Sequence, residues 1–522
     1  MPNRNSTLTS ISLVRKGYFP RELPPPFSTE KLANLLERDP EVVPRGNART
    51  QCVRHNLARP GGFRRPLQVP NPRSFLHLAE EFQAQWPTIR AHIRGHSFSM
   101  SRPVATLAEL ERAVRPRFRI GERDRLRPRD WRGKRFVLRT DVNQFYSSLY
   151  THSIPWALEG KRKAKKNLGK TASDRLDKAL RNVSDGQTMG VPIGPDTSFL
   201  AAEIVMTAVD KSLESKLSLR GHRYFDDYEL AFTTRSGAEE ALALLEDALA
   251  EYELAINPTK TEILELPQPF HDAWTHELST FRVRTGKAAH TIADLLAMFS
   301  QAAAMSRLRA GPLKYALLRS REIGVVNDDV WKALQNLVWS AVSSEPTTMA
   351  AALDLLAEKS AESGLDIDRD AAAEVIEALI LTHSPIRNAS EVAWALWAAI
   401  ALDVEMTGQA GEAVIAMDDD LVALLALDAN SRRLFGTHRL NRSNWEALTD
   451  YDGVMSGAHW LLAYEGSVRK WLNAPADRVG ADPFFKALRR RRVRFYDSDP
   501  VRHPFTGPAG PLPGGLVPDE YV

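Results

Sequence analysis

The sequence has very little cysteine, since Cys52 is the only one among 522 residues. A single thiol excludes a disulfide scaffold and a zinc site made of several cysteines. Long hydrophobic runs are also missing: no stretch of about 18 apolar residues is present, the length that a helix needs to cross a bilayer. Residues 1–17 mix polar and basic side chains and do not resemble a secretory signal. We therefore expect a reduced, cytoplasmic protein with no membrane partner.

Positive and negative charges nearly balance, with 69 Lys and Arg against 65 Asp and Glu, but the basic residues are clustered. Bases outnumber acids by 13 to 5 in residues 101–140, by nine to two in 161–181 and by six to none in 486–494. Such clusters indicate a polyanionic partner, and the alternative is a solvated basic face. Residues 401–431 contain seven acids and no base. They either face a basic surface of a second copy, which makes a homo-oligomer, or form a solvated helix face.

Periodicity divides the chain into parts with different secondary structure. The first hundred residues are rich in proline and predict irregular structure, with an extended arm between Phe19 and Phe27 that packs on its own domain rather than serving as an SH3 ligand. Residues 286–480 predict helices of about 15–20 residues, arranged as a degenerate helical repeat or an irregular bundle. Residues 481–522 begin with a basic run and continue with proline and glycine, which predicts little regular structure.

Between these parts the pattern is mixed α/β and predicts a sheet with helices on one face. Residues 135–142 alternate as a strand that delivers Asp141 to the solvent side, and 222–232 predict a hairpin. Residues 197–217 have helical periodicity. A capping-box spacing from Ser236 to Glu239 begins another helix.

Three carboxylates are candidates for chemistry: Asp141 at a strand end, and Asp226 and Asp227 in the hairpin turn. Adjacent acids repel each other unless a cation lies between them, and carboxylate oxygens suit Mg²⁺. Two such ions accelerate phosphoryl transfer by holding the attacking and leaving oxygens. The alternative for an isolated Asp-Asp pair is a solvated turn.

Four segments occur in the order of the reverse transcriptase motifs and resemble them. The resemblance rests on Asp141-Val-Asn-Gln-Phe-Tyr146 (motif A), Gly190-Val-Pro-Ile-Gly194 (motif B), Tyr224-Phe-Asp-Asp227 (motif C) and Leu254-Ala-Ile-Asn257-Pro-Thr-Lys260 (motif D). The segments 17–27, 150–158 and 390–397 are similar to the bacterial abortive-infection and "unknown group" defence-associated reverse transcriptases. That resemblance implies an α+β right-hand polymerase with palm and fingers, followed by an all-α, HEAT-like helical-repeat domain. Its domains are then an arm and the start of the fingers in residues 1–100, fingers and palm in 101–285, helical repeats in 286–480 and a tail in 481–522.

The resemblance also implies roles for individual residues. Asp141, Asp226 and Asp227, with the backbone of Val142, hold two Mg²⁺ ions. Tyr146 lies under the sugar and excludes a 2′-hydroxyl, with Phe145 as the competing candidate. Lys260 protonates pyrophosphate or neutralises phosphate at the surface. The turn of motif B approaches the nucleotide through Gly190, Gly194 and Pro195. Ile193 replaces the usual glutamine, which puts conventional templated copying in question.

Basic residues supply further candidates, for the triphosphate and for nucleic acid. Those near motif A are Arg127, Arg129, Lys134, Arg135 and Arg139, with Arg139 preferred because it shares a strand face with Asp141. The backbone of RNA or single-stranded DNA is expected on Lys161, Lys163, Lys165 and Lys166, with a solvated loop as the alternative. Tyr496 and Tyr521 are weaker candidates for protein priming.

The function implied is RNA-directed DNA synthesis from dNTPs in anti-phage defence by a nucleotidyltransferase, with protein-primed or untemplated synthesis as an open option. A non-coding RNA or a phage trigger joins the expected partners. Two alternatives are open. One is a templated reverse transcriptase of retron or group II intron type, and the other is a non-catalytic sensor or scaffold with a polymerase-like fold.

Overall fold

The N-terminal part of the chain is ordered rather than irregular, which corrects the expectation from its prolines. The computed structural model describes residues 7–44, 46–59, 62–95, 98–106, 112–167, 169–307, 311–325, 327–473 and 476–499. The first elements are α1 (Ser10–Lys16), α2 (Glu30–Arg38), the hairpin of β1 (Val53–Ala58) and β2 (Arg64–Val69), and α3 (Pro72–Arg94). The proline content wrongly predicted irregular structure, because a proline in the first turn of a helix favours the helix, as Pro72 does in α3. Asn71 caps that helix by accepting from the Arg73 N–H.

A four-stranded antiparallel sheet lies at the centre of the polymerase-like half, in the order β6-β7-β5-β8. The strands are β5 (Phe136–Thr140), β6 (Gly221–Tyr224), β7 (Asp227–Phe232) and β8 (Glu262–Glu265). The predicted strand and hairpin are confirmed. Leu138 pairs with Leu230, and both are fully buried in the main core, to which helices α9 (Asp196–Lys216) and α10 (Arg235–Ala250) contribute. The N-cap of α10 is Thr234, not the predicted Ser236.

The opposite face of this sheet is also covered, because α4 (Arg123–Trp131) packs on it. Val137 and Ala231 form a small apolar cluster there with Trp131. The remaining elements of this half are β3 (Pro103–Ala105), β4 (Val114–Pro116), α5 (Phe145–Ser148), α6 (Ser153–Glu159), α7 (Lys161–Lys166) and α8 (Ala172–Val183).

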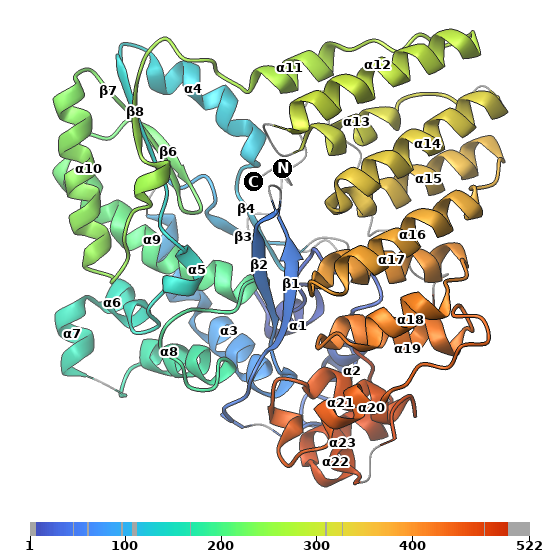
Figure 1. The fold of residues 1–522 in the computed structure, drawn as a ribbon. Coiled ribbons are helices and arrows are strands. Elements are labelled where there is room, and N and C mark those ends of the chain that lie inside the picture. The colour runs from blue at the N-terminus through green and yellow to red at the C-terminus, as the bar shows by residue number, and fades with distance from the viewer. Residues whose placement is uncertain are drawn as a thin grey trace.

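The second half is helical, as predicted. Figure 1 shows its helices descending in a column beside the β1–β2 hairpin. Each helix from α12 to α17 packs against the next but one, and α12, α14 and α16 also pack extensively against the next. No helix in the described residues is long and apolar enough to cross a membrane. The helices are α11 (Ala273–Thr280), α12 (Ala288–Ser306), α13 (Pro312–Ser320), α14 (Asp328–Ser344), α15 (Met349–Ser363), α16 (Arg369–His383), α17 (Ala389–Leu402), α18 (Gly408–Ile415), α19 (Asp420–Ser431), α20 (Ser443–Thr449), α21 (Trp460–Val468), α22 (Arg478–Ala481) and α23 (Pro483–Arg490).

Polar contacts join the two halves along the β1–β2 hairpin. The buried His55 ring lies 3.0 Å from Asp419, and Arg64 donates to both oxygens of Glu391. The predicted arm packs on its own chain as expected, since Phe27 is buried and bridges to Tyr496. The contacts of His55 and Arg64 therefore hold the hairpin against the helical half.

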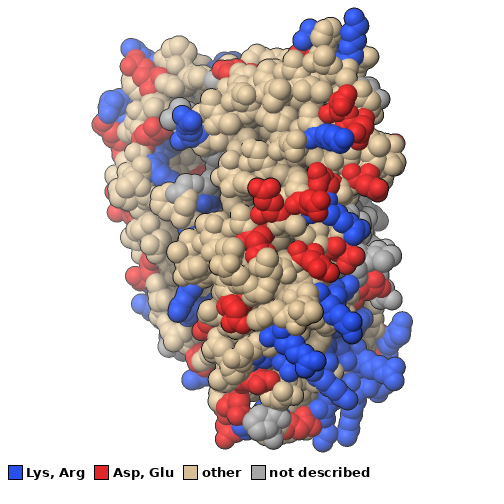
Figure 2. All heavy atoms as spheres, turned by 45° about the vertical axis from the view of Figure 1, so that its right-hand side comes forward, with Lys and Arg blue, Asp and Glu red and all other residues tan. Residues whose placement is uncertain are grey.

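The acidic segment 401–431 is not one continuous surface, because three of its seven acids are buried, and the four exposed ones leave both interpretations of the segment as predictions. Asp419, Asp420 and Asp428 are buried and paired with His55, His459 and Arg432 respectively. The four exposed acids are Asp403, Glu405, Glu412 and Asp418. Figure 2 shows acidic side chains gathered over the middle of the face that it draws and basic side chains at the lower end of that face. Helices α22 and α23 lie at the lower end of the molecule in Figure 1.

Candidate active site

The three predicted carboxylates converge where β5 ends and the β6–β7 hairpin turns. Thr140 pairs with Tyr228, so the same register places Asp141 opposite Asp227. The Val142 N–H donates to the carbonyl of Asp226 at 3.3 Å, which ties motif A to the turn of motif C. Contacts between strands far apart in sequence thus bring the acids together, as the strand and hairpin patterns predicted.

Burial makes this acid cluster electrostatically unfavourable. Asp141 is only 5% exposed, so the prediction that it faces solvent is wrong; α4 covers that side of the sheet. The pKa of Asp226 is raised to about 7, chiefly by burial and then by the charges of Asp227 and Asp141. Burial also raises the pKa of Asp227. Such a site favours bound protons or a cation over three free negative charges.

Lys260 supplies one positive charge at this site. Its Nζ donates to Asp141 Oδ2 at 2.5 Å, and this hydrogen bond raises the pKa of Lys260. The other oxygen of Asp141 is buried and has no hydrogen-bond partner among the described residues. A buried, unpartnered carboxylate oxygen beside two further acids suits a hard divalent cation. In the described part of the chain, however, no three His, Cys, Asp or Glu side chains form a ready-made ligand set, so ion binding requires these side chains to rearrange.

The structure separates the two aromatic candidates of motif A. Phe145 is 4% exposed and belongs to the hydrophobic core, whereas Tyr146 is only partly buried. The pKa of the Tyr146 phenol is raised by burial and then by the charge of Asp226, while Arg65 opposes the shift. Tyr146 therefore lies between the acid cluster and the β1–β2 hairpin.

The glycines of motif B approach other parts of the protein closely. Gly190, at φ +84°, would place a Cβ 3.1 Å from the carbonyl oxygen of Ser147, and Gly194 would place one 2.4 Å from Cγ of Pro20. Arg112 holds this contact by donating to the carbonyls of Gly194 and Phe19. The N-terminal arm, rather than a nucleotide, occupies the space beside Gly194 in this structure.

Pro195 and Ile193 also lie against protein. Pro195 is buried at the N-cap of α9, which leaves it no surface for the predicted nucleotide contact. The carbonyl of Ile193 accepts from the Gln68 N–H at 3.0 Å. Motif B is thereby joined to β2.

Residues 118–288 match the family model described as reverse transcriptase (RNA-dependent DNA polymerase). These residues form a reverse transcriptase domain. The chain is accordingly an RNA-directed DNA polymerase, a nucleotidyltransferase. No curated protein matches the sequence. Among solved structures, apo telomerase from Candida tropicalis is similar at 12% identity and a TM-score of 0.32, over 76% of this chain and 72% of that one; a likeness at this level carries no argument.

Within the reverse transcriptase domain, the arginine preferred from the sequence does not point at the acids. Arg139 and the buried Arg127 both donate to Glu229 on β7, at 3.3 and 3.0 Å. Two other bases of this group are also engaged: Arg135 pairs with Glu265 and Arg129 with Asp130. The alternation of residues along the strand predicted correctly which face of β5 carries Arg139. It could not show that Glu229 of β7 pairs with Arg139 across the sheet.

Two arginines that were not predicted from the sequence, Arg59 and Arg65, act electrostatically on this site. Burial and the neighbouring Arg65 lower the pKa of Arg59, whereas the charges of Asp226 and Asp141 raise it. Arg65 in turn acts on Tyr146. Both belong to the β1–β2 hairpin and its turn, far from motif A in sequence. The basic character of residues 54–65 was the available signal, hidden by the larger basic clusters that follow.

The predicted nucleic-acid lysines form a short helix, not a loop. Lys163, Lys165 and Lys166 of α7 are exposed, but Lys161 lies 4.2 Å above the Trp156 ring and donates to the carbonyl of Glu251. The priming candidate Tyr496 is fully buried, and its hydroxyl donates to Asp428. A buried hydroxyl cannot reach a nucleotide, so Tyr496 is excluded; Tyr521 lies outside the described residues.

Proposed function

We propose that this protein is a Mg²⁺-dependent reverse transcriptase that builds DNA from dNTPs in a bacterial anti-phage defence system in the cytoplasm. The observation that carries the proposal is the convergence of Asp141, Asp226 and Asp227 inside the matched domain. Reverse transcriptase domains use divalent metal ions, and the buried, repelling carboxylates fit that need. A scaffold without catalysis would gain nothing from keeping such a cluster.

In this proposal the chain's own residues orient the reactants. Asp141, Asp226 and Asp227, with the backbone of Val142, would hold two Mg²⁺ ions, which would supply charge stabilisation to the attacking and leaving oxygens. The 3′-hydroxyl or a protein hydroxyl loses its proton to water and attacks the α-phosphorus. A new P–O bond forms, the bond from the α-phosphorus to the α–β bridging oxygen breaks, and pyrophosphate leaves. The charges of Asp226 and Asp141 act on Arg59, and the charge of Arg65 acts on Tyr146, which supports these two arginines as the groups that bind the triphosphate.

Two further residues act at the sugar and the leaving group. Tyr146 supports the sugar and leaves no room for a 2′-hydroxyl. Lys260 leaves Asp141 when a cation enters and gives a proton to the pyrophosphate. Its place beside the acids supports this role, because the hydrogen bond to Asp141 keeps the Lys260 ammonium protonated until that bond is broken.

The narrower assignment to defence rests on the second half of the chain and on Ile193. An apolar side chain at motif B cannot hydrogen-bond a template, which supports synthesis that is untemplated or primed by protein. Stacked helices after the domain support a HEAT-like repeat, a homo-oligomer, and contacts with a non-coding RNA or a phage trigger. Retron and group II intron enzymes, the templated alternative, lack so large a helical half.

The test is incorporation of labelled nucleotides by purified protein with Mg²⁺, with and without added RNA template and primer. We expect active-site-dependent incorporation of dNTPs without either addition, and acceptance of rNTPs only after Tyr146→Ala; Phe145→Leu is the control on the buried neighbour. Synthesis that requires template would support the retron-like alternative. Loss of phage protection in the Asp226→Ala/Asp227→Ala variant excludes the scaffold, whereas protection by that variant would establish it.

Metal binding should depend on pH in a direction set by Asp226. Its pKa of about 7 in the folded protein lies above the ordinary value of 3.8, so protons stabilise the metal-free fold at low pH, and this stabilisation is lost as the pH rises through 7. Mg²⁺ competes with those protons. We therefore expect Mg²⁺ to raise the melting temperature more at pH 8 than at pH 6, measured by differential scanning fluorimetry with EDTA as the reference. An equal shift at both values would contradict this assignment.

A further inference from the structure

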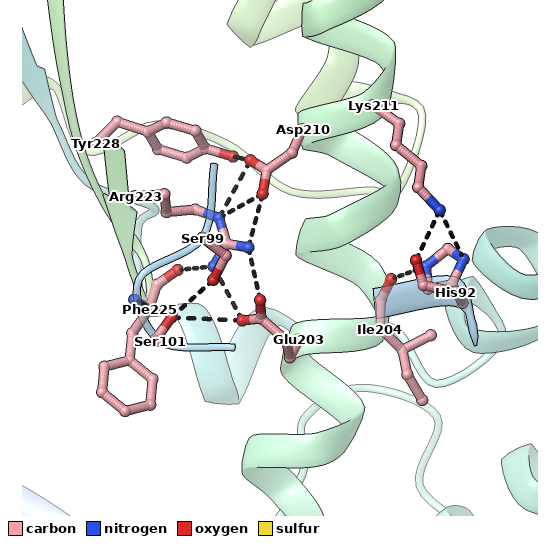
Figure 3. Close-up of polar contacts among 10 residues, drawn as sticks. All are labelled: His92, Ser99, Ser101, Glu203, Ile204, Asp210, Lys211, Arg223, Phe225 and Tyr228. Atoms are coloured by element: carbon pink, nitrogen blue, oxygen red, sulfur yellow. Dashed lines mark hydrogen bonds and ion pairs between the residues drawn. The ribbon is translucent and has the colours of Figure 1, made fainter. Parts of the chain in front are cut away.

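A buried ion-pair cluster lies directly behind the turn that carries Asp226. Helix α9 presents Glu203 and Asp210, two helical turns apart, to Arg223 on β6. Arg223 and Asp210 are 0% exposed and Glu203 is 2% exposed. Figure 3 shows the guanidinium of Arg223 between the two carboxylates. Its Nη1 and Nη2 each donate to Glu203 at 3.0 Å, and its Nε and Nη2 donate to Asp210 at 2.9 and 2.7 Å.

The charges of this cluster keep Arg223 ionised. Burial lowers its pKa, but Asp210 and Glu203 more than offset that effect, and the pKa lies well above the ordinary value. Tyr228, one residue after the motif C acids, also donates its hydroxyl to Asp210 at 2.7 Å. One cation therefore faces two carboxylates in a place without solvent. Buried ion pairs of this kind contribute little net stability compared with apolar packing, so their retention suggests a demand for precise geometry.

The same guanidinium reaches the turn itself. Nη1 of Arg223 donates to the carbonyl oxygen of Phe225 at 2.6 Å, and the Phe225 N–H donates to Ser101 Oγ at 2.7 Å. Phe225 has φ +53°, a left-handed conformation that a residue with a side chain rarely adopts. Both ends of this residue are thus held, and Asp226 follows it immediately. Ser101 also contacts Glu203, at 3.4 Å, which closes the network.

We propose that Arg223 is a positioning residue, which together with Ser101 fixes the left-handed turn at Phe225 and so aims the Asp226 carboxylate at its divalent cation. This inference rests on the proposed function, because it deepens the account of the same site. The guanidinium is suited to the task, since its planar fork satisfies Glu203, Asp210 and the Phe225 carbonyl at once. A lysine ammonium keeps the charge but is a single point and cannot reproduce these contacts.

The first test replaces Arg223 by lysine, with Arg127→Lys as the matched control. Arg127 is also buried and also bonded to a glutamate, Glu229, which excludes it as a triphosphate ligand. Its hydrogen bonds within the described residues go to Glu229, Asp124 and Phe270 and not to the turn. We expect Arg223→Lys to lower kcat roughly 10- to 100-fold with little change in the KM for dNTP, the loss typical of a misplaced reactive group. Arg127→Lys should leave kcat within about threefold of wild type on the same reasoning.

A second readout does not need catalysis: Mn²⁺ binding measured by electron paramagnetic resonance. We expect the apparent Kd for Mn²⁺ to rise about five- to tenfold in Arg223→Lys, because a misplaced carboxylate weakens ion binding without abolishing it. If Arg223→Lys does not fold, Ser101→Ala serves instead, because it releases the other end of Phe225 with a minimal change in volume, and the same weakening of Mn²⁺ is expected.

The outcomes separate the two proposals. Normal Mn²⁺ affinity and normal kcat in a folded Arg223→Lys or Ser101→Ala variant would overturn the positioning role, as would a loss of kcat that equals the loss of folded protein. If wild type incorporates no nucleotide yet binds Mn²⁺ more tightly than these variants, the positioning role stands and the proposed function fails.

Discussion

Replacing Asp226 by asparagine should reduce nucleotide incorporation about a thousandfold or more. Asparagine keeps the volume of aspartate but removes the charge, and charge stabilisation by a bound metal ion contributes several kcal/mol to phosphoryl transfer, where about 1.4 kcal/mol is a tenfold rate change. The rate is measured as single-nucleotide incorporation at saturating dNTP. Asp141→Asn should act similarly, and it also removes the charged partner of Lys260.

The same substitution should stabilise the metal-free protein, which distinguishes a functional loss from unfolding. Asp226 sits among like charges and its pKa is raised by burial, so neutralising it removes an unfavourable interaction. We expect the melting temperature of Asp226→Asn in EDTA to equal or exceed that of wild type at pH 8. Asp247→Asn, on the exposed face of α10, is the matched control and should change neither property. Retention of more than a tenth of the activity in Asp226→Asn would contradict its role as a metal ligand.

Gly194→Ala should cost about 2–6 kcal/mol of stability and most of the activity. The backbone contributes about 1–3 kcal/mol, since φ at Gly194 is +126°. Overpacking adds about 1–3 kcal/mol, because the new Cβ would lie 2.4 Å from Cγ of Pro20. Displacing Pro20 would also disturb the arm that Arg112 ties to motif B. Urea denaturation and the incorporation assay measure the two effects.

Two further variants divide this loss into its causes. Gly286 has a similar φ of +114° with no atom within 4 Å of an added Cβ. The loss of stability in Gly286→Ala should therefore come from backbone strain alone. Pro20→Gly in the Gly194→Ala background should recover the steric share, which makes the double variant more stable than the sum of the single effects predicts. Equal losses in Gly194→Ala and Gly286→Ala, with no recovery in the double variant, would exclude the contact with Pro20 as a cause.

Much of the site was predictable because its signals are local. Alternation in residues 135–142 and the paired acids of the hairpin predicted strands β5, β6 and β7. The order of the four motifs then predicted the domain that the family model matches. Helical periodicity similarly predicted the second half of the chain. These features depend on neighbours within a few residues, which the sequence displays directly.

The tertiary structure alone decided which charged groups face the acids. Arg139 has the predicted strand face, but register places Glu229 opposite it, so its charge is neutralised there. Arg59 acts on Asp226 because a hairpin some 170 residues away in sequence folds over the site, and no local pattern encodes that distance. The cluster of Arg223, Glu203 and Asp210 is likewise formed only when β6 packs on α9. Sequence determined the strands, the hairpin and the helices of the second half, together with the three candidate acids, because these patterns are local. Long-range packing determined burial, ion pairing and the geometry of the turn.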